Sequence, residues 1–369
     1  MSDVRSDAQT AVPTNLPTNL QTNLQDDARS GEPTNLRTEA EPPVRTEVRI
    51  GPLDDGAAHA VRELAARAAR SDGVMPLSEQ PLLWLQDDQA PVRHVLALDG
   101  GTSDGDGALV GYAQLDVAVQ ATARGELVVD PEHRRRGVGR ALLDAARRVA
   151  DEAAEQLPDR ALHVWAHGDL PGARAFATDA RMVVVRELWV MRRPLTTADA
   201  TREVAVPLGV TLRTFVPGQD EEAWRRVNSR AFAHHPEQGR MTSADLRARE
   251  RESWFDPEGF LLAERDGMLL GSVWTKVHPA GEHGDTPVGE IYVVGVDPDA
   301  QGLGLGGALT AAGIRHLAGR GLHEVILYTG AENEVAVRTY RRAGFEQAET
   351  DVMFGTDTRR SPSGATMAS

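Results

Sequence analysis

Two glycine-rich stretches of the chain have the residue types and spacing of a phosphate-binding loop. They read LVVDPEHRRRGVGRALL, from Leu127 to Leu143, and VGVDPDAQGLGLGGAL, from Val294 to Leu309. In each, an apolar run predicts a strand, the glycines predict a tight turn, and the following segment predicts a helix whose first N–H groups can bind phosphate without a positive side chain. Asp130 and Asp297 stand 167 residues apart (297 minus 130), as do the glycines. A spacing close to half the chain predicts a duplicated domain.

The glycine spacing also limits which nucleotide the loops could hold. It does not match the G-x-x-x-x-G-K-[ST] pattern of a loop that binds nucleotide with magnesium. A dinucleotide fingerprint fits poorly, because it belongs to the first strand of a βαβ unit and needs an acidic residue about 20 positions further on. The alternative is a turn that merely joins a strand to a helix. Two copies at the same place in two similar halves weigh against that alternative.

The same order of elements surrounds both loops. In the second half we expect strands at 211–215, within 259–277 (two strands around a turn), at 289–296, 323–329 and near 351–354, with helices at 220–232, 306–320 and through Tyr340. In the first half we expect strands at 46–50, 94–98, 108–117, 126–130, 161–166 and 183–191, with helices around 58–69 and through Val149. This order predicts an α/β fold of two tandem domains, each a mixed central β-sheet flanked by helices.

The remaining segments divide the chain into domains and tails. Residues 1–45 repeat Thr-Asn-Leu among prolines and polar residues, and 356–369 are rich in Ser, Gly and Arg, so both are expected to be disordered tails. We place an N-terminal domain at 46–193, a linker at 194–207 and a C-terminal domain at 208–355.

Composition excludes several classes of function. The chain of 369 residues has no cysteine, which rules out disulfides, thiolate metal ligands and a cysteine nucleophile. No apolar run approaches the roughly 20 residues that cross a bilayer, and the polar N-terminus lacks a signal peptide's apolar core. A net charge of −15 argues against nucleic-acid binding. We therefore expect a cytoplasmic monomer that binds neither a membrane nor nucleic acid.

The loops and two further motifs resemble a known superfamily. RRRGVG from Arg134 and QGLGLG from Gln301 match the Gln/Arg-x-x-Gly-x-Gly/Ala signature of the GNAT acetyltransferases, and NEVAVRTYRRAGF from Asn333 is similar to a later motif of these enzymes. The tandem arrangement, with AFAHHPEQG, WTKVHP and GEIYVVGVDP in the second half, resembles the mycothiol synthase family over roughly residues 46–355.

The resemblance implies acetyl-CoA as acetyl donor, with the glycine loop holding its pyrophosphate and the preceding strand pairing with its pantetheine arm. In the C-terminal domain it implies contacts from Val294, Gly295, Val296, Gln301, Gly302, Leu303, Gly304, Leu305, Gly306, Gly307, Asn333, Glu334, Val335, Ala336, Val337 and Arg338. For a second acetyl-CoA in the N-terminal domain it implies Leu127, Val128, Val129, Arg135, Arg136, Gly137, Val138, Gly139 and Arg140.

The two halves differ in two residues that could transfer protons. Acetyl transfer to an amine needs a base for the amine proton and an acid for the departing thiolate. Glu290 is the candidate base, acting through water, and Tyr340 is the candidate acid. In the first half Ala123 stands at the place of Glu290, and Ala177 or a neighbour, with no tyrosine nearby, stands at the place of Tyr340. Taken singly, Glu290 could be a solvated strand end and Tyr340 a core aromatic. Their joint loss favours an active C-terminal domain and a non-catalytic N-terminal one.

The oxyanion of the reaction needs a hydrogen-bond donor. We expect a backbone N–H near Val294, on a strand splayed by a bulge at Gly295, where a glycine interrupts an apolar run.

The family's substrate, implied by the resemblance, is the cysteinyl amide of a glucosaminyl-inositol, a small-molecule amine. The resemblance places Glu79, Glu237, Lys276, Glu290 and Tyr328 around it. Lys276 is the only lysine, in a chain that otherwise uses arginine, although biased coding could also leave a single survivor. Because Glu79 belongs to the first half, the site should lie in a cleft between domains.

Two other interpretations stay open, and one kind of ligand is not expected. The alternatives are another GNAT enzyme, acting on a protein N-terminus or an aminoglycoside-like amine, and a non-catalytic acetyl-CoA sensor. His234 and His235 have no third ligand at metal spacing, so we expect no metal.

Overall fold

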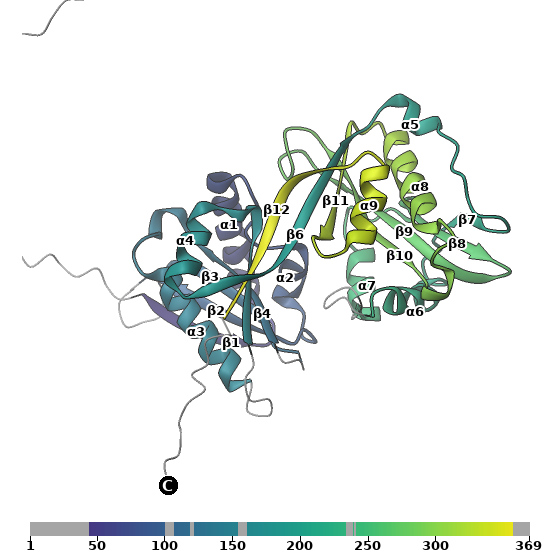
Figure 1. The fold of residues 1–369 in the computed structure, drawn as a ribbon. Coiled ribbons are helices and arrows are strands. Elements are labelled where there is room, and N and C mark those ends of the chain that lie inside the picture. The colour runs from purple at the N-terminus through teal and green to yellow at the C-terminus, as the bar shows by residue number, and fades with distance from the viewer. Residues whose placement is uncertain are drawn as a thin grey trace, which may run out of the picture. The chain divides into compact units, whose positions relative to one another are not determined.

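One continuous sheet organises the chain in the computed structural model, which describes residues 44–99, 107–118, 122–153, 161–233, 239 and 241–356. Within this part the sheet has twelve strands in the order β1-β2-β3-β4-β5-β12-β6-β11-β10-β9-β8-β7. Helices cover both of its faces (Figure 1). The expected α/β class with mixed sheets is confirmed. None of the described helices has the length and hydrophobicity that a membrane crossing requires.

The first half is built around the strands from β1 to β6. Its elements are β1 (Arg45–Ile50), α1 (Asp55–Asp72), α2 (Glu79–Leu83), β2 (Val92–Leu98), β3 (Leu109–Asp116), β4 (Thr122–Val129), α3 (Val138–Glu152), β5 (Ala161–Ala166), α4 (Pro171–Asp179) and β6 (Met182–Pro194). Alternate residues of one strand face opposite helices: Val95 belongs to the core beneath α3, and Leu96 to the core beneath α1. This period of two is what buries both faces of the sheet.

The second half repeats the plan. Its elements are α5 (Thr197–Thr201), β7 (Thr211–Thr214), α6 (Glu221–Ala231), α7 (Ser243–Glu250), β8 (Phe260–Arg265), β9 (Met268–His278), β10 (Val288–Val296), α8 (Leu305–Gly319), β11 (Glu324–Gly330), α9 (Glu334–Arg342) and β12 (Glu346–Thr356). Val273 faces the core beneath α8, and its neighbour Trp274 faces an aromatic core beneath α6 and α7.

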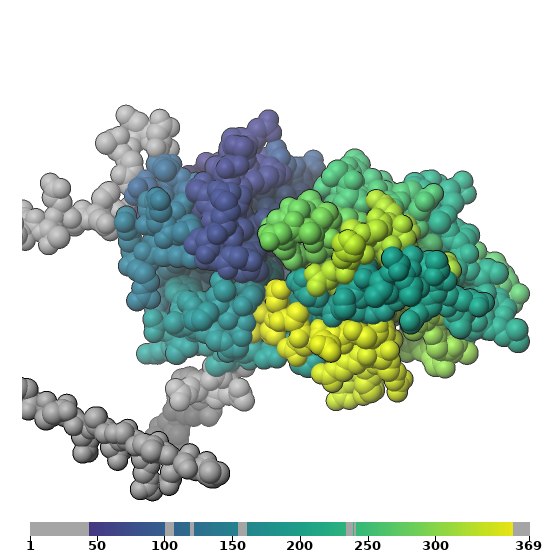
Figure 2. All heavy atoms as spheres, turned by 90° about the horizontal axis from the view of Figure 1, so that it is seen from above, coloured from purple at the N-terminus to yellow at the C-terminus, as the bar shows by residue number. Residues whose placement is uncertain are grey.

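The last strand of each half pairs with the other half. β12 lies between β5 and β6, and β6 in turn pairs with β11. Val352 and Phe354 of β12 are buried in the core of the first half, while Met191 of β6 is buried in the core of the second. The two strands lie against each other where the halves meet (Figures 1 and 2). The domain limits expected from the sequence, 46–193 and 208–355, therefore assign to each domain one strand that the other half needs.

The segment expected to be a linker, 194–207, contains a helix. Thr196 and Asp199 form a reciprocal cap at the start of α5. Asp199 is buried and accepts a hydrogen bond from Arg193 at 2.7 Å. These contacts fix α5 against the body of the protein beside α8.

Candidate active site

The glycine loop of the second half is built to present backbone N–H groups. Gly302 and Gly304 have φ values of +82° and +79°, in the left-handed region that favours glycine. Gly304 is the N-cap of α8, and no side chain caps this helix. The first N–H groups of α8 therefore remain available to an anion such as a phosphate.

The first half keeps the same loop conformation. Gly137, the N-cap of α3, has φ +87°, and no side chain caps this helix either. Arg135, which corresponds to Gly302, also has a positive φ of +64°. A non-glycine residue rarely adopts this conformation. The loop shape is thus retained although one of its glycines is not.

The strands next to the second loop separate to form an opening. β10 and β11 pair in parallel only from Gly289 to Ile291. Beyond that point β10 continues beside β9 alone, and β11 beside β6. An edge of β10 that ends at a phosphate-binding loop is suited to pair with an extended ligand.

The β-bulge of β10 lies at Tyr292 and not, as expected, at Gly295. The register with β9 shifts between Ile291 and Val293, whereas Gly295 pairs regularly with Ser272. A Cβ at Gly295 would lie 3.4 Å from a ring carbon of Phe232, the residue that follows α6, which is an ordinary van der Waals contact. The extra residue turns Tyr292 and Val293 toward the same core beneath α6 and α7, and it returns Val294 to the side of α8.

Glu290 lies on β10 just before the bulge and is 5% exposed. Its Oε2 is 2.7 Å from Nε2 of His278, whose Nδ1 is 2.8 Å from Oε2 of Glu282. Burial raises the pKa of Glu290, but the hydrogen bond and charge of His278, together with Lys276, bring that pKa below the usual value. Burial lowers the pKa of His278, and hydrogen bonds with Glu282 and Glu290 raise it to about 9. At neutral pH the pair is a carboxylate beside an imidazolium.

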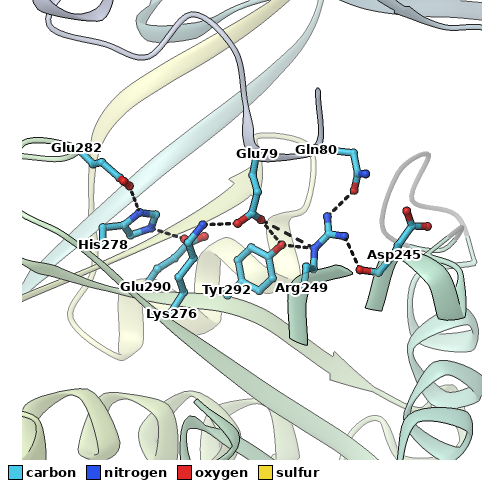
Figure 3. Close-up of polar contacts among 9 residues, drawn as sticks. All are labelled: Glu79, Gln80, Asp245, Arg249, Lys276, His278, Glu282, Glu290 and Tyr292. Atoms are coloured by element: carbon cyan, nitrogen blue, oxygen red, sulfur yellow. Dashed lines mark hydrogen bonds and ion pairs between the residues drawn. The ribbon is translucent and has the colours of Figure 1, made fainter. Parts of the chain in front are cut away.

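A second group of polar residues connects the two halves across the cleft (Figure 3). Nζ of Lys276 donates to Oε1 of Glu79 at 2.5 Å, and the Tyr292 hydroxyl donates to Oε2 of the same carboxylate at 2.5 Å. Arg249 of α7 donates to the Tyr292 hydroxyl at 2.6 Å and to Oε1 of Gln80 at 2.5 Å. Glu79 and Gln80 belong to α2 of the first half, so this group brings the halves together at the site.

Two tyrosines line the cleft farther along. Tyr340 lies on α9, where burial raises its pKa to about 12, so its hydroxyl keeps its proton. Asn333 caps this helix by accepting from the Ala336 N–H at 3.1 Å. Tyr328 on β11 is 36% exposed, and the loss of water around its hydroxyl, followed by the charge of Glu290, raises its pKa. Both hydroxyls are therefore proton donors at neutral pH.

A single cleft of about 2520 Å³ joins most of these features. Of the residues predicted for the active site, its lining includes Glu79 of the first half and, from the second half, Lys276, Glu290, Tyr328, Tyr340, Val294, Gly295, Val296, Gln301, Gly302, Gly304, Leu305, Gly306, Gly307, Asn333, Val335 and Ala336. Leu303, Glu334, Val337 and Arg338 belong to the same segments but do not line it. Nor do the N-terminal loop residues, 127–129 and 135–140. Glu237, His234 and His235 lie outside the described residues.

One group in the described part of the chain has the composition of a metal site. Ligand atoms of His278, Glu282 and His283 lie within 4.8 Å of one another. Both ring nitrogens of His278, however, already lie at hydrogen-bond distance from carboxylates, Glu282 and Glu290. His278 could bind an ion only by giving up one of these contacts.

Several residues of the site were not predicted from the sequence. They are Gln80, Arg249, Trp254, His278, Glu282 and Tyr292. Tyr292 stands two positions after Glu290 and could have been suspected from strand alternation. Nothing in the sequence connects Arg249, in a helix, with a tyrosine 43 positions away.

Comparisons with known proteins agree with this geometry. Residues 224–345 match the Acetyltransferase (GNAT) family, and residues 92–176 match an Acetyltransferase (GNAT) domain. Two solved structures share the tandem fold. The GCN5-related N-acetyltransferase from Sphaerobacter thermophilus has a TM-score of 0.58 and 26% identity, covering 85% of this chain and 96% of its own. A tandem GNAT protein from the clavulanic acid pathway has a TM-score of 0.60 and 20% identity, covering 84% and 98%. The fold and the loops thus define a tandem GNAT acetyltransferase.

Relatives with similar sequences show which family of tandem GNAT acetyltransferases the chain belongs to. The mycothiol acetyltransferase of Cellulomonas flavigena is 60% identical over 357 residues, which cover 90% of this chain and 100% of the relative. That of Sanguibacter keddieii is 51% identical over 313 residues, covering 84% and 96%. The chain belongs to the mycothiol acetyltransferase family.

Proposed function

We propose that this protein transfers the acetyl group of acetyl-CoA to the cysteinyl amine of 1D-myo-inositol 2-(L-cysteinylamino)-2-deoxy-α-D-glucopyranoside, the last step of mycothiol biosynthesis. The observation that carries the proposal is the single cleft that joins the uncapped glycine loop to Glu290 and to Glu79 of the other half. The names of the relatives support the substrate. The glycine loop would hold the pyrophosphate, and the open edge of β10 would pair with the pantetheine arm.

The chemistry follows from the two groups predicted to move protons. Glu290 takes a proton from the ammonium group through a water molecule, and the neutral amine attacks the thioester carbonyl carbon. A backbone N–H of β10 near Val294 stabilises the oxyanion that forms. When the carbon–sulfur bond breaks, Tyr340 gives its proton to the departing thiolate, and the second proton that nitrogen loses as the amide forms returns to the Tyr340 phenolate. The burial that raises the pKa of Tyr340 also disfavours a thiolate beside it, so the two proton affinities move together.

The substrate side would be shared by the two halves. Glu79, Lys276 and Tyr328, with Glu237, offer charged and hydroxyl groups to a polyhydroxylated amine. The Lys276 ammonium lies 4.7 Å from the ring centre of Trp254, and its charge is compensated by Glu79 at 2.5 Å. A compact ammonium fits between the aromatic ring and the carboxylate, where a planar guanidinium would need more room.

For the first half we propose a non-catalytic acetyl-CoA site. The uncapped start of α3 and the retained loop shape support phosphate binding. β4 pairs with β5 up to Glu126, so the opening for a pantetheine arm begins later than in the second half. Ala123 replaces the base there, and Ala177 of α4 replaces the acid.

The test is a competition between acceptors. The purified protein is given acetyl-CoA with the cysteinyl substrate, its precursor without cysteine, an aminoglycoside and an N-terminal peptide, and acetylated products are quantified by mass spectrometry. We expect acetylation of the cysteinyl amine. Preference for the peptide or the aminoglycoside would support another GNAT activity. Binding of acetyl-CoA without any transfer would support a sensor, and calorimetric stoichiometry would report whether one or two molecules bind.

A further inference from the structure

Three side chains form a line from the buried base candidate to the surface: Glu290, His278 and Glu282 (Figure 3). Glu290 and His278 are almost fully buried, and the Glu282 side chain is 47% exposed. The line belongs to the β9–β10 hairpin alone, because His278 ends β9 and Glu282 lies in the connection to β10.

We propose that His278 is a positioning residue for acetyl transfer: it holds the Glu290 carboxylate in place and charged, and Glu282 in turn holds His278. The inference rests on the proposed role of Glu290 as base, and it assigns to His278 no contact with either substrate.

The position of the contact is set by the register of the sheet. Glu290 pairs with Lys276 across the strands, and His278 pairs with Val288, so Glu290 and His278 are diagonal neighbours on one face. The imidazole occupies Oε2 of Glu290. Oε1 is then the oxygen left to accept the amine proton or a bridging water. A fixed carboxylate orientation of this kind is what proton abstraction requires.

The second effect of His278 on Glu290 comes from its positive charge. The titratable groups that face His278 are Glu282 in the connection, Glu290 on β10, Lys276 on β9 and His283, whose ring centre is 4.4 Å away. The two carboxylates stabilise the imidazolium, which lowers the pKa of Glu290 against the effect of burial. Without the imidazolium, burial would remain and the pKa of Glu290 would rise. A base protonated at working pH cannot accept the proton of the amine.

The test compares His278→Gln and Glu282→Gln with the unaltered protein. Glutamine can still donate a hydrogen bond to Glu290 but carries no charge. The readout is kcat against pH at saturating substrates, because kcat reports the bound complex and is not affected by titration of the free amine. We expect the acidic limb of kcat in His278→Gln to move up by about 1–3 pH units, the size of a neighbouring-charge effect. Activity should recover at higher pH, and Glu282→Gln should shift the limb less.

Two controls separate this inference from the proposed function. His316→Gln alters a half-buried histidine on α8 that pairs with Asp256 outside the cleft, and it should leave the limb in place. Glu290→Gln should lower kcat about a hundredfold at pH values above the acidic limb and should remove the limb itself. If Glu290→Gln keeps full activity, the proposed base is wrong. If Glu290→Gln is inactive but His278→Gln loses activity equally at all pH values, or loses none, then His278 does not position the base and only this inference fails.

Discussion

The last strand of each half contributes buried residues to the core of the other half, which we call the strand exchange. This exchange predicts where Phe354→Ala should destabilise the protein. Phe354 lies on β12, near the C-terminus of the second half, but its side chain is buried in the core of the first half. It pairs with Val164 of β5 on one side and Val184 of β6 on the other. The substitution should therefore loosen a part of the molecule almost 200 residues away in sequence.

The size of the effect follows from the burial of the ring. Phe354 is 6% exposed, and its neighbour Val352 is fully buried in the same core. Truncating a buried phenylalanine to alanine lowers the free energy of unfolding by about 3–5 kcal/mol. A domain is stable by only about 5–15 kcal/mol, so the loss is a large part of the total. Fold and cleft should survive at 25 °C, with a clear fall in the unfolding midpoint.

Hydrogen exchange read by mass spectrometry locates the effect. In Phe354→Ala, peptides from α3 and β5 should exchange faster, while those from α8 should change little. Leu309→Ala, a fully buried site on α8, should show the opposite pattern. Because Glu79 is held by the first half, the KM for the amine should rise more than the KM for acetyl-CoA. Faster exchange confined to β11 and α8 in Phe354→Ala would refute the idea that β12 stabilises the first half.

Two further predictions concern buried proton-bearing groups. Tyr340→Phe should lower kcat about a hundredfold, the size of losing a general acid, while the calorimetric Kd of acetyl-CoA stays within about twofold because packing against Phe345 remains; an equal loss of binding and turnover would make Tyr340 a packing residue. His167 lies 3.0 Å from Asp351 of β12 and 3.3 Å from Glu126 of β4. Burial lowers the pKa of His167, but these carboxylates raise it to about 10. Its contribution to stability should be complete below about pH 6.5, the unfolded value, and should fade as the pH rises toward 10. Urea unfolding should show this loss in the unaltered protein and a flatter pH dependence in His167→Gln; identical slopes would contradict the assignment.

Much of the architecture could be predicted from local patterns. The loop geometry follows from glycine spacing, since Gly302 and Gly304 do adopt the left-handed backbone that the pattern implies. The order of the strands and of helices α1, α3, α6, α8 and α9 follows from apolar periodicity, whereas the helices α2, α4, α5 and α7 were not expected. The duplication follows from one constant offset between the two loops. These are properties that a short stretch of chain carries by itself.

Which strands are neighbours could not be predicted in the same way. β6 and β12 have apolar patterns that indicate strands but do not encode which half each should join. The GNAT matches end at residues 176 and 345, before each exchanged strand, so they do not reveal the exchange either. The bulge was expected at Gly295 but lies at Tyr292, and the reason is related. A glycine is a local signal, whereas this bulge depends on the register between β9 and β10. The roles of Glu290 and Tyr340 stay predictions.

The exchange also gives a reason why a half without proton-transfer residues would be retained. The polar cluster at the cleft requires Glu79 and Gln80 from α2 to meet Lys276, Tyr292 and Arg249 of the second half within hydrogen-bond distance. If a flexible linker joined the two domains, these hydrogen bonds would have to form again each time the domains closed. Each closure would then cost conformational entropy. Strands that cross between the cores fix these contacts in advance, so the first half can serve acetyl transfer as a fixed wall of the substrate site while contributing neither the acid nor the base.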